Sequence, residues 1–274
     1  MSAPWQARLP DLAKRLDRCL QQWRLVPEPP FPGLSYNYTV PVRLPDGTPA
    51  VLKISMPGES ATEAEALRLC DGEGAVRLLA VGEGALLLER ALPGRALPHR
   101  HGCEAVAAAV MRRLWRPVPE GHPFPSVAEW GTRAFANHRA RFGGPGPMPP
   151  ELFQAAEETL AERPAAPCLL HGDLHHSNIL SGTRSSWLAI DPKGVVGEAA
   201  FDTYAFLHNP VGVEIAPAEQ RRRADALGEA LGMERAWLRR WAVAGMVLSA
   251  LWSLEGGEPG WTHAIACAQP LFDD

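Results

Sequence analysis

Cysteine is scarce in this chain and forms no recognisable motif. The cysteines are odd in number, widely scattered and without a C-x-x-C pair, at positions Cys19, Cys70, Cys103, Cys168 and Cys267. Zinc-binding and thioredoxin-like proteins usually carry such pairs. The pattern therefore argues against those classes and indicates free thiols in a reducing cytoplasm.

The sequence also lacks long apolar runs and a strong charge of either sign. No segment approaches the ~20 apolar residues of a membrane span, and residues 1–20 are amphipathic and charged, unlike a signal peptide. The formal net charge is −4, whereas binding a polyanion normally needs a clustered excess of Lys and Arg. We expect a cytoplasmic monomer that binds neither membranes nor nucleic acid, with a charge that suits a cationic small molecule.

The apolar residues that are present predict two lobes. A chain of 274 residues can bury one large core or two modest ones. Apolar spacing and turn residues predict, in order, a helix over 9–23, a hairpin around residues 46–47, a helix over 61–70 and a hairpin around residues 82–84. After the connector ALPGRAL, helical periodicity dominates. We therefore expect an N-terminal lobe of residues 1–92 and a mostly helical lobe of residues 93–274, with the run Arg221 to Arg223 on a solvated helix face.

One short segment, LLHGDLHHSNIL at residues 169–180, concentrates side chains with chemistry. Asp173 and Asn178 have the spacing of a kinase catalytic loop, in which the Asp receives the substrate hydroxyl proton and the Asn holds magnesium. Gly172 stands where that loop usually has Arg. The next residues predict a strand, a turn and a strand that delivers Asp191 beside the loop. Such oxygen ligands suit Mg²⁺, although Asp191 is followed by Pro-Lys-Gly instead of Phe-Gly.

A zinc site is the alternative interpretation of this segment, because His171, Asp173, His175 and His176 are all possible ligands. The sequence has no H-E-x-x-H helix and no second Cys/His cluster to complete such a site. A protein of that kind would contain stoichiometric zinc and would not bind ATP.

A phosphotransferase also needs a cation that contacts the nucleotide phosphates. Lys53, in AVLKIS, lies at the end of a predicted strand like the Lys of the kinase motif V-A-I-K. The helix that follows offers Glu63 and Glu65 as alternative anionic partners.

The motifs HGDLHHSNIL, IDPKG and GEAAFDTYAFLHNP together resemble the aminoglycoside phosphotransferase family, within it the streptomycin 6-phosphotransferase and hydroxyurea-resistance kinase branch. EAEALRLCDGEGAVRLL, LLLERALPG and LWRPVPEGHPFPSVAEW extend the resemblance over most of the chain. The resemblance implies an α+β, bilobal, protein-kinase-like fold: a small N-terminal lobe with an antiparallel sheet, a larger helical C-terminal lobe, and ATP in the cleft between them.

The same resemblance implies a role for each matching residue. Asp173 is the expected catalytic base, and Asn178 and Asp191 are the expected magnesium ligands. Lys53 is expected to contact phosphate with Glu63 as its favoured partner. The backbone from Glu89 to Ala91 is the expected hinge that binds adenine.

Other parts of the site leave alternatives open. The segment GLSYNYTV is not a G-x-G-x-x-G loop, so Ser35 and Asn37 are equally candidates for phosphate contacts and for a structural turn. His171 is expected to support the loop, while the roles of His175 and His176 are undecided. Acceptor-binding carboxylates are sought first at Glu198 and Asp202, and Asp202 has an equal claim to buttress the catalytic loop. Trp252 is a candidate flank of the acceptor pocket.

The sequence thus predicts an ATP- and Mg²⁺-dependent kinase that phosphorylates a hydroxyl of a small molecule, an aminoglycoside such as streptomycin, and so confers antibiotic resistance. One alternative is a kinase of a cellular sugar or amino alcohol, because a fold does not fix a substrate. Another is a pseudokinase that binds nucleotide without turnover. The presence of the Lys, both Asp residues and the Asn together argues against the pseudokinase.

Overall fold

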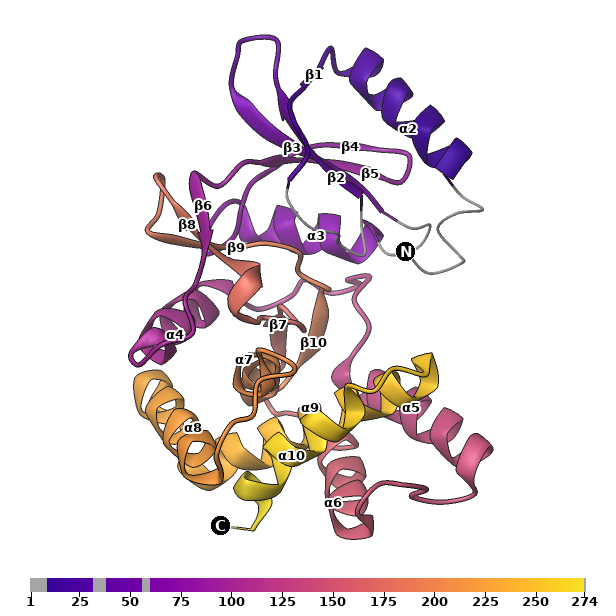
Figure 1. Cartoon of the computed structure of the whole chain (residues 1–274), viewed down its shortest axis with the longest axis vertical. Coiled ribbons are helices and arrows are strands. Elements are labelled where there is room, and N and C mark those ends of the chain that lie inside the picture. Colours follow the sequence, from indigo (N-terminus) through magenta and orange to yellow (C-terminus); the bar gives the residue numbers. More distant parts are fainter. Residues whose placement is uncertain (1–8, 32–37, 56–59, 274) are drawn as a thin grey trace.

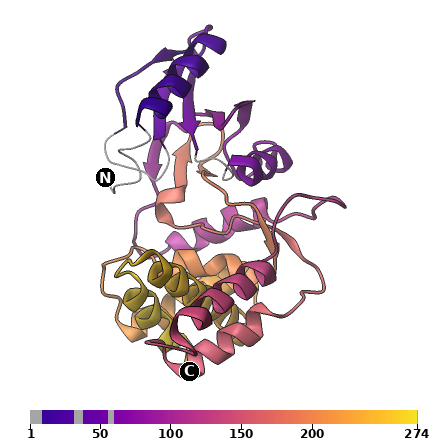
Figure 2. The same cartoon turned by 90° about the vertical axis from the view of Figure 1, so that its right-hand side faces the viewer.

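The computed structural model describes residues 9–31, 38–55 and 60–273. An antiparallel sheet with two helices forms one end of the molecule and a group of helices forms the other, with short strands between them (Figures 1 and 2). None of the helices in these described ranges combines the length and the hydropathy needed to cross a membrane.

The sheet end comprises residues 9–89. Its strands are ordered β1-β2-β3-β5-β4, and all neighbours are antiparallel. The turn between β2 and β3 is the predicted one, with Gly47 at φ 83° and Thr48 N donating to Asp46 Oδ1 at 2.9 Å. In chain order the elements are α2 (Leu9–Gln22), β1 (Val26–Pro27), β2 (Tyr38–Arg43), β3 (Pro49–Ile54), α3 (Ser60–Cys70), β4 (Leu78–Gly82) and β5 (Ala85–Glu89).

The two faces of this sheet belong to different cores, because side chains alternate along a strand. Leu87 of β5 and Leu52 of β3 pack in the core beneath α2, together with partly buried leucines of that helix. Leu86 and Leu88 face the other way, into the core that contains Leu67 of α3. Lys53 follows Leu52 in β3, so the alternation directs its side chain to the α3 face.

Two small sheets connect the ends of the molecule. The first has the order β6-β8-β9 and the second pairs β10 with β7, all antiparallel. The segment expected to be a plain connector therefore contains a strand, β6, that pairs with a hairpin more than eighty positions later in the chain. The bounds are β6 (Pro93–Ala96), β7 (Cys168–Leu170), the 3₁₀ turn η1 (His176–Asn178), β8 (Ile179–Gly182), β9 (Trp187–Ala189) and β10 (Val195–Gly197).

The helical end surrounds α9, most of whose side chains are buried. Helices α5, α6, α7 and α10 all pack against α9, and α4 packs on α8 (Figure 1). These elements are α4 (Cys103–Leu114), α5 (Val127–Phe142), α6 (Pro150–Leu160), the 3₁₀ turn η2 (Ala199–Asp202), α7 (Thr203–His208), α8 (Pro217–Leu231), α9 (Arg235–Gly256) and α10 (Trp261–Phe272).

The arginine run of α8 is not wholly solvated, contrary to expectation. Arg223 is buried, and its guanidinium group donates to the backbone oxygens of Leu207 and Phe206, both at 2.9 Å, and of Asn209 at 3.1 Å. These carbonyls lie at the end of α7, where helix carbonyls lack intrahelical partners and favour a cation. The expectation was wrong because another segment supplies these acceptors.

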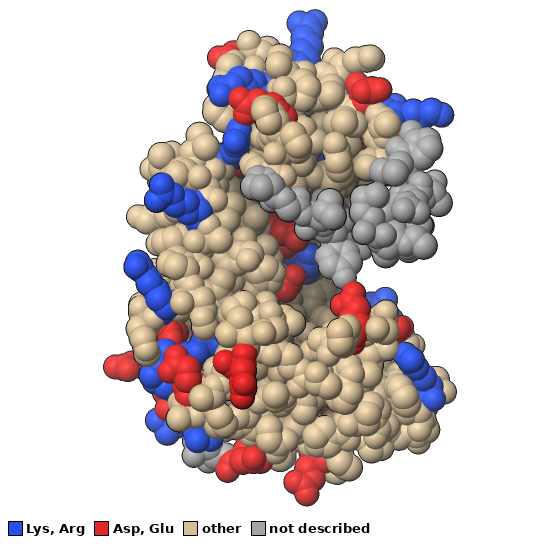
Figure 3. All heavy atoms as spheres, viewed as in Figure 1, with Lys and Arg blue, Asp and Glu red and all other residues tan. Residues whose placement is uncertain are grey.

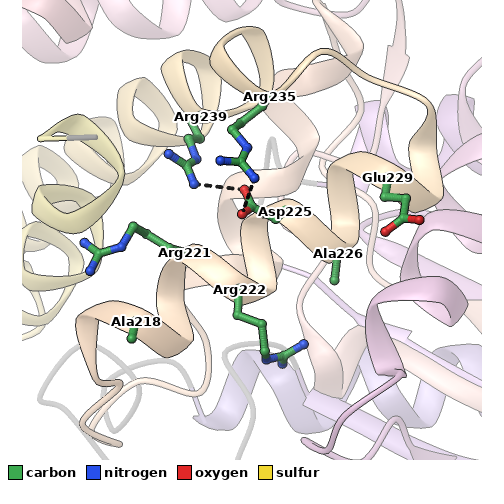
Figure 4. A pocket seen from close by; sticks show the side chains of 8 residues that line it. All are labelled: Ala218, Arg221, Arg222, Asp225, Ala226, Glu229, Arg235 and Arg239. Carbon is green, nitrogen blue, oxygen red and sulfur yellow. Dashed lines mark hydrogen bonds and ion pairs between the residues drawn. The ribbon is translucent and has the colours of Figure 1, made fainter.

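On its open side, α8 borders a hollow of about 540 Å³ shared with the start of α9 (Figure 4). Asp225 lies in this hollow and accepts from Arg235 at 2.8 Å and from Arg239 at 2.9 Å. Arg222 pairs with Glu219, also at 2.8 Å. Of the four arginines that line this hollow, Arg222, Arg235 and Arg239 are therefore held by carboxylates of the same protein, whereas Arg221 contacts the backbone oxygen of Pro270 at 3.5 Å.

Replacing Arg223 by alanine is expected to lower the free energy of unfolding by at least about 3 kcal/mol, since hydrogen bonds to a charged group contribute roughly 1.5–3 kcal/mol each and buried carbonyls would lose their donor. Urea denaturation of the variant measures this loss. Arg221→Ala is the matched control, because Arg221 is half-buried and lies two positions away. Equal stability of the two variants would show that Arg223 is not a structural support.

Candidate functional site

Lys53 lies in the middle of a buried ion cluster. Its Nζ atom donates to Glu63 Oε1 at 2.7 Å and Oε2 at 2.6 Å, and it also pairs with Asp191 Oδ1. Glu63 is in the first turn of α3, directly under the face of β3 that carries Lys53. Glu65 pairs instead with Arg68 on the same helix. The structure therefore places Glu63, not Glu65, against Lys53.

Residues 171–175 form a loop whose backbone is held from beneath by Asp202. This carboxylate is fully buried and accepts from Gly172 N at 2.7 Å, His171 N at 2.9 Å and Trp115 Nε1 at 3.1 Å. Tyr204 Oη donates to Gly172 O at 2.8 Å. Of the two alternatives for Asp202, these contacts favour the buttress of the loop.

Gly172 is required by the shape of this loop. Its φ of +81° is disfavoured for other residues, and a Cβ atom there would lie 3.0 Å from both Trp130 Cη2 and Val195 Cγ1. Glycine therefore stands here instead of the Arg of the usual kinase loop because a side chain at this position would crowd Trp130 and Val195.

All three histidines make contacts that support the loop or the 3₁₀ turn η1 that follows it. His171 Nε2 donates to Ile190 O at 2.8 Å, and Nδ1 accepts from Asp173 N at 3.2 Å, which confirms its expected supporting role. Burial lowers the pKa of His171 to about 3, so the ring is neutral. His176 is also buried and stacks on Phe206 with a centroid distance of 4.3 Å. His175 Nδ1 accepts from Ser177 N at the start of η1.

Asp173 is partly exposed beside this rigid loop. Its backbone oxygen accepts from Asn178 Nδ2 at 2.9 Å, which connects the loop to the end of η1. Burial raises the pKa of the Asp173 carboxyl to about 6, against the opposing effect of Lys193. A carboxylate with a pKa just below neutral is ionised at pH 7 yet basic enough to accept a proton, which suits a general base.

Asp191 follows β9 and brings a second carboxylate to the loop. Its φ of +60° is uncommon for a residue other than glycine, and such backbone strain concentrates at functional sites. Ile190 N donates to Asn178 O at 2.9 Å, so Asp191 and Asn178 lie on hydrogen-bonded segments. Burial raises the pKa of Asp191, but Lys53 and Lys193 together lower it overall, so the group is ionised.

This donor set fits Mg²⁺. Asn178 uses its Nδ2 group in the loop, which leaves Oδ1 for a metal, and Asp191 supplies an ionised carboxylate. Mg²⁺ is usually held by one or two protein oxygens, with water and phosphate completing its shell. In the ranges that the structure describes, no group of three or more His, Cys, Asp or Glu side chains is arranged to hold a metal ion.

Lys193 is a site residue that the sequence reasoning missed. Its Nζ atom lies 3.0 Å from Asp191 Oδ2 and 3.9 Å from Asp173 Oδ2. The departure from the kinase motif, Pro-Lys-Gly after Asp191, was the available signal.

Acidic and basic side chains lie together in the hollow between the sheet and the helices, as the space-filling view shows (Figure 3).

The expected hinge lies at the end of β5. The Glu89 side chain accepts from Arg184 Nη2 at 2.8 Å and from Arg77 N at 2.9 Å, so it supports this connection through its carboxylate. Ala91 is buried and lies two residues on, just before β6. The phosphate-contact candidates Ser35 and Asn37 lie outside the described residues.

The structure does not bring Glu198 to the catalytic loop. Glu198 follows Gly197, which pairs with Cys168 at the start of β7, whereas the loop follows the end of β7. Its Oε1 atom instead accepts from Trp237 Nε1 at 3.3 Å.

A cavity of about 280 Å³ lies between α5 and the end of α9. The rings of Trp130 and Trp252 meet edge to face in its wall, with centroids 5.4 Å apart. The Trp130 ring also borders Gly172. Asn137 Nδ2 donates to Glu255 Oε1 at 2.9 Å in the same wall. The cavity therefore adjoins the loop that carries Asp173, and its wall contains aromatic rings, the Glu255 carboxylate and the Arg133 guanidinium.

Comparison with known proteins matches this chain to one family over most of its length. The family model described as aminoglycoside/hydroxyurea antibiotic resistance kinase matches residues 22–257. Hydroxyurea phosphotransferase of Kitasatospora aureofaciens is 35% identical over 90% of this chain and 74% of its own. Streptomycin 6-kinase of Streptomyces glaucescens is 33% identical over 97% of this chain and 90% of its own. Streptomycin 3''-kinase of Klebsiella pneumoniae is 31% identical over 87% of this chain and 92% of its own.

Solved structures confirm the α+β, bilobal, protein-kinase-like fold. A thermostable mutant of the aminoglycoside phosphotransferase APH(4)-Ia, in ternary complex with ADP and hygromycin B, superposes with a TM-score of 0.65 at 14% identity, covering 93% of this chain and 97% of its own. Choline kinase LicA from Streptococcus pneumoniae superposes with a TM-score of 0.64 at 12% identity, covering 96% of this chain and 98% of its own. At these identities the likeness shows the fold alone.

Proposed function

Because this chain belongs to the aminoglycoside/hydroxyurea antibiotic resistance kinase family, we propose that it transfers the γ-phosphoryl group of ATP to a hydroxyl of an aminoglycoside such as streptomycin. The observation that carries the proposal is the convergence of Lys53, from the large sheet, with Asp173 and Asp191, from the loop and strand segments of the second lobe, in one hollow (Figure 3). Phosphoryl transfer requires mainly such positioning and charge stabilisation.

The nucleotide would lie between the sheet and the helical end. Lys53 is held by Glu63 at 2.6 Å and so presents its ammonium at a fixed position to the α and β phosphates. The backbone from Glu89 to Ala91 would bind adenine at the edge of the same hollow. We place the boundary between the lobes after residue 92, because β5 is the last strand of the large sheet and β6 pairs with β8 of the second lobe.

Asn178 and Asp191 would hold Mg²⁺ on the phosphates. When bound, the ion neutralises charge on the phosphate oxygens. The protein contributes the two oxygen donors, one on each of two backbone segments that are joined by a hydrogen bond of 2.9 Å.

Asp173 would orient the acceptor hydroxyl and accept its proton. Its carboxylate is accessible to solvent, while the backbone on both sides of it is fixed by Asp202, Tyr204 and Asn178. A positioned base of this kind contributes on the order of 10²–10⁴-fold to the rate.

The acceptor would occupy the cavity between α5 and α9. Trp130 and Trp252 offer ring faces and edges, and Glu255 offers a negative charge. Aromatic rings and carboxylates both attract cations, so this part of the wall suits the guanidinium or ammonium groups of an aminoglycoside, while the exposed Arg133 in the same lining would face the hydroxyl groups of the acceptor. A cytoplasmic monomer remains a prediction of the sequence.

The decisive experiment is incubation of the purified protein with ATP, Mg²⁺ and a panel of streptomycin, other aminoglycosides, hydroxyurea and sugar or amino alcohols. Mass spectrometry detects the gain of one phosphoryl group. Phosphorylated streptomycin is the expected product. If only a sugar or amino alcohol gains mass, the acceptor assignment is wrong and the kinase assignment holds. If nothing gains mass while Mg·ATP binds, the aminoglycoside assignment fails and the acceptor is a metabolite outside the panel; if ATP does not bind either, the kinase assignment fails.

A further inference from the structure

We propose that Lys193 is a catalytic residue whose ammonium group contacts the γ-phosphoryl group during transfer. The inference rests on the proposed phosphotransferase function and assigns a role to the Pro-Lys-Gly segment that replaces the usual kinase motif. Its basis is the position of Lys193 Nζ between the carboxylates of Asp173 and Asp191.

The two carboxylates mark the path of the transferred group. Asp191 would hold the ion that is bound to the phosphates, and Asp173 would meet the acceptor hydroxyl, so the γ-phosphorus must pass between them. Lys193 Nζ lies 3.0 Å from Asp191 Oδ2 and 3.9 Å from Asp173 Oδ2, and its side chain is 41% exposed. An ammonium group at this place would reach a phosphoryl oxygen by movement of its side chain alone.

The backbone of Lys193 is fixed to the catalytic loop. Lys193 N donates to His171 O at 2.8 Å, two residues before Asp173. The next residue, Gly194, has a φ of +65°, and a Cβ atom there would lie 2.7 Å from Thr62 O. The lysine therefore stands on a rigid base, and only its flexible stem has to adjust when a phosphate arrives.

The use of lysine at this position is itself informative. The chain has only three lysines, Lys14, Lys53 and Lys193, among 27 basic residues. Lys53 and Lys193 both belong to this cluster. A lysine presents a compact, mobile point charge, whereas arginine presents a larger planar fork, so a narrow gap between two carboxylates and a phosphate suits lysine.

The step is balanced without a further reactant. The acceptor oxygen bonds to the γ-phosphorus, the bond from that phosphorus to the bridging β–γ oxygen breaks, and ADP leaves with those electrons. The hydroxyl proton goes to Asp173, and Lys193 keeps its own proton throughout. Negative charge that spreads over the phosphoryl oxygens is stabilised by the nearby ammonium, as in other phosphoryl-transfer sites.

Steady-state kinetics of Lys193→Met and Lys193→Arg test the proposal. Because loss of one preorganised charge-stabilising donor costs about 10²–10³ in kcat, Lys193→Met is expected to lower kcat by about that factor with little change in the KM for the acceptor. The kcat of Lys193→Arg is expected to be at least about tenfold higher than that of Lys193→Met. Lys14→Met, on the exposed face of α2, removes the same charge as a control. A kcat of Lys193→Met within about threefold of wild type, with a lower melting temperature, would reduce Lys193 to a structural partner of the two carboxylates.

A second readout needs no turnover. Acetylation by an N-hydroxysuccinimide ester, followed by mass spectrometry, reports the reactivity of Lys193 relative to the exposed Lys14. The imido analogue of ATP with Mg²⁺ is expected to protect Lys193 more than ADP with Mg²⁺ does. Equal protection would overturn the contact with the γ-phosphoryl group. If no acceptor is phosphorylated but the difference in protection is present, the assignment of Lys193 stands and the proposed acceptor fails.

Discussion

Asp173→Asn is expected to lower kcat by about 10²–10⁴-fold while the affinity for Mg·ATP stays nearly unchanged, because the amide keeps the shape of the side chain but cannot accept the hydroxyl proton. Steady-state phosphorylation of the identified acceptor gives kcat, and calorimetric titration gives the nucleotide affinity. Glu229→Gln, an exposed carboxylate on α8, removes the same charge far from the loop and is expected to leave kcat within about threefold.

The Asp173→Asn variant is also expected to unfold at a higher temperature than wild type at pH 7. Burial raises the pKa of Asp173 to about 6, whereas an unfolded Asp titrates near pH 4. Between these values the folded state binds more protons, so the stability of the wild type falls as the pH rises through this window. Asparagine does not ionise, so the variant does not lose stability as the pH rises. The difference in stability between the variant and wild type is therefore expected to vanish below pH ~4. Ordinary turnover by a well-folded Asp173→Asn protein would remove Asp173 as the base.

The chemistry of this site is partly readable from sequence because some of its spacing is local. The five-residue step from Asp173 to Asn178 lies within one loop, and the strand, turn and strand that follow were predicted and form β8 and β9. Lys53 could be identified from its place at the end of a predicted strand. Each of these predictions needed only neighbours along the chain.

Contacts between distant segments could not be predicted in this way. The choice between Glu63 and Glu65 depends on which side of α3 faces the sheet. The register of β7 with β10 decides that Glu198 lies away from the loop, and the fold places Asp202 beneath it. Arg223 was misread as solvated because its acceptors come from α7. Lys193 was missed for the same reason, because its place in the site depends on the fold bringing it beside Asp173, twenty positions earlier in the chain.

Among the residues that could be read from sequence, Asp191 gives the sharpest test of the proposed metal site. Asp191→Ala is expected to weaken the binding of Mg·ATP by at least about 10–100-fold, a loss typical even of groups that only orient metal ligands, and to lower turnover as well. Asp191→Asn is a needed companion, because asparagine tolerates the left-handed backbone at φ +60° better than alanine does.

The binding of metal-free ATP, measured by calorimetry in the presence of a chelator, separates a ligand role from a structural one. Asp191 is a negative charge next to Lys53 and Lys193, so its removal takes away a carboxylate that competes with the triphosphate for both ammonium groups, while Lys53 keeps its pair with Glu63. Metal-free ATP is therefore expected to bind either Asp191 variant at least as tightly as wild type, while Mg·ATP binds more weakly. If Mg·ATP affinity is unchanged, Asp191 is not a metal ligand; if both forms of ATP bind more weakly, Asp191 acts by shaping the nucleotide site.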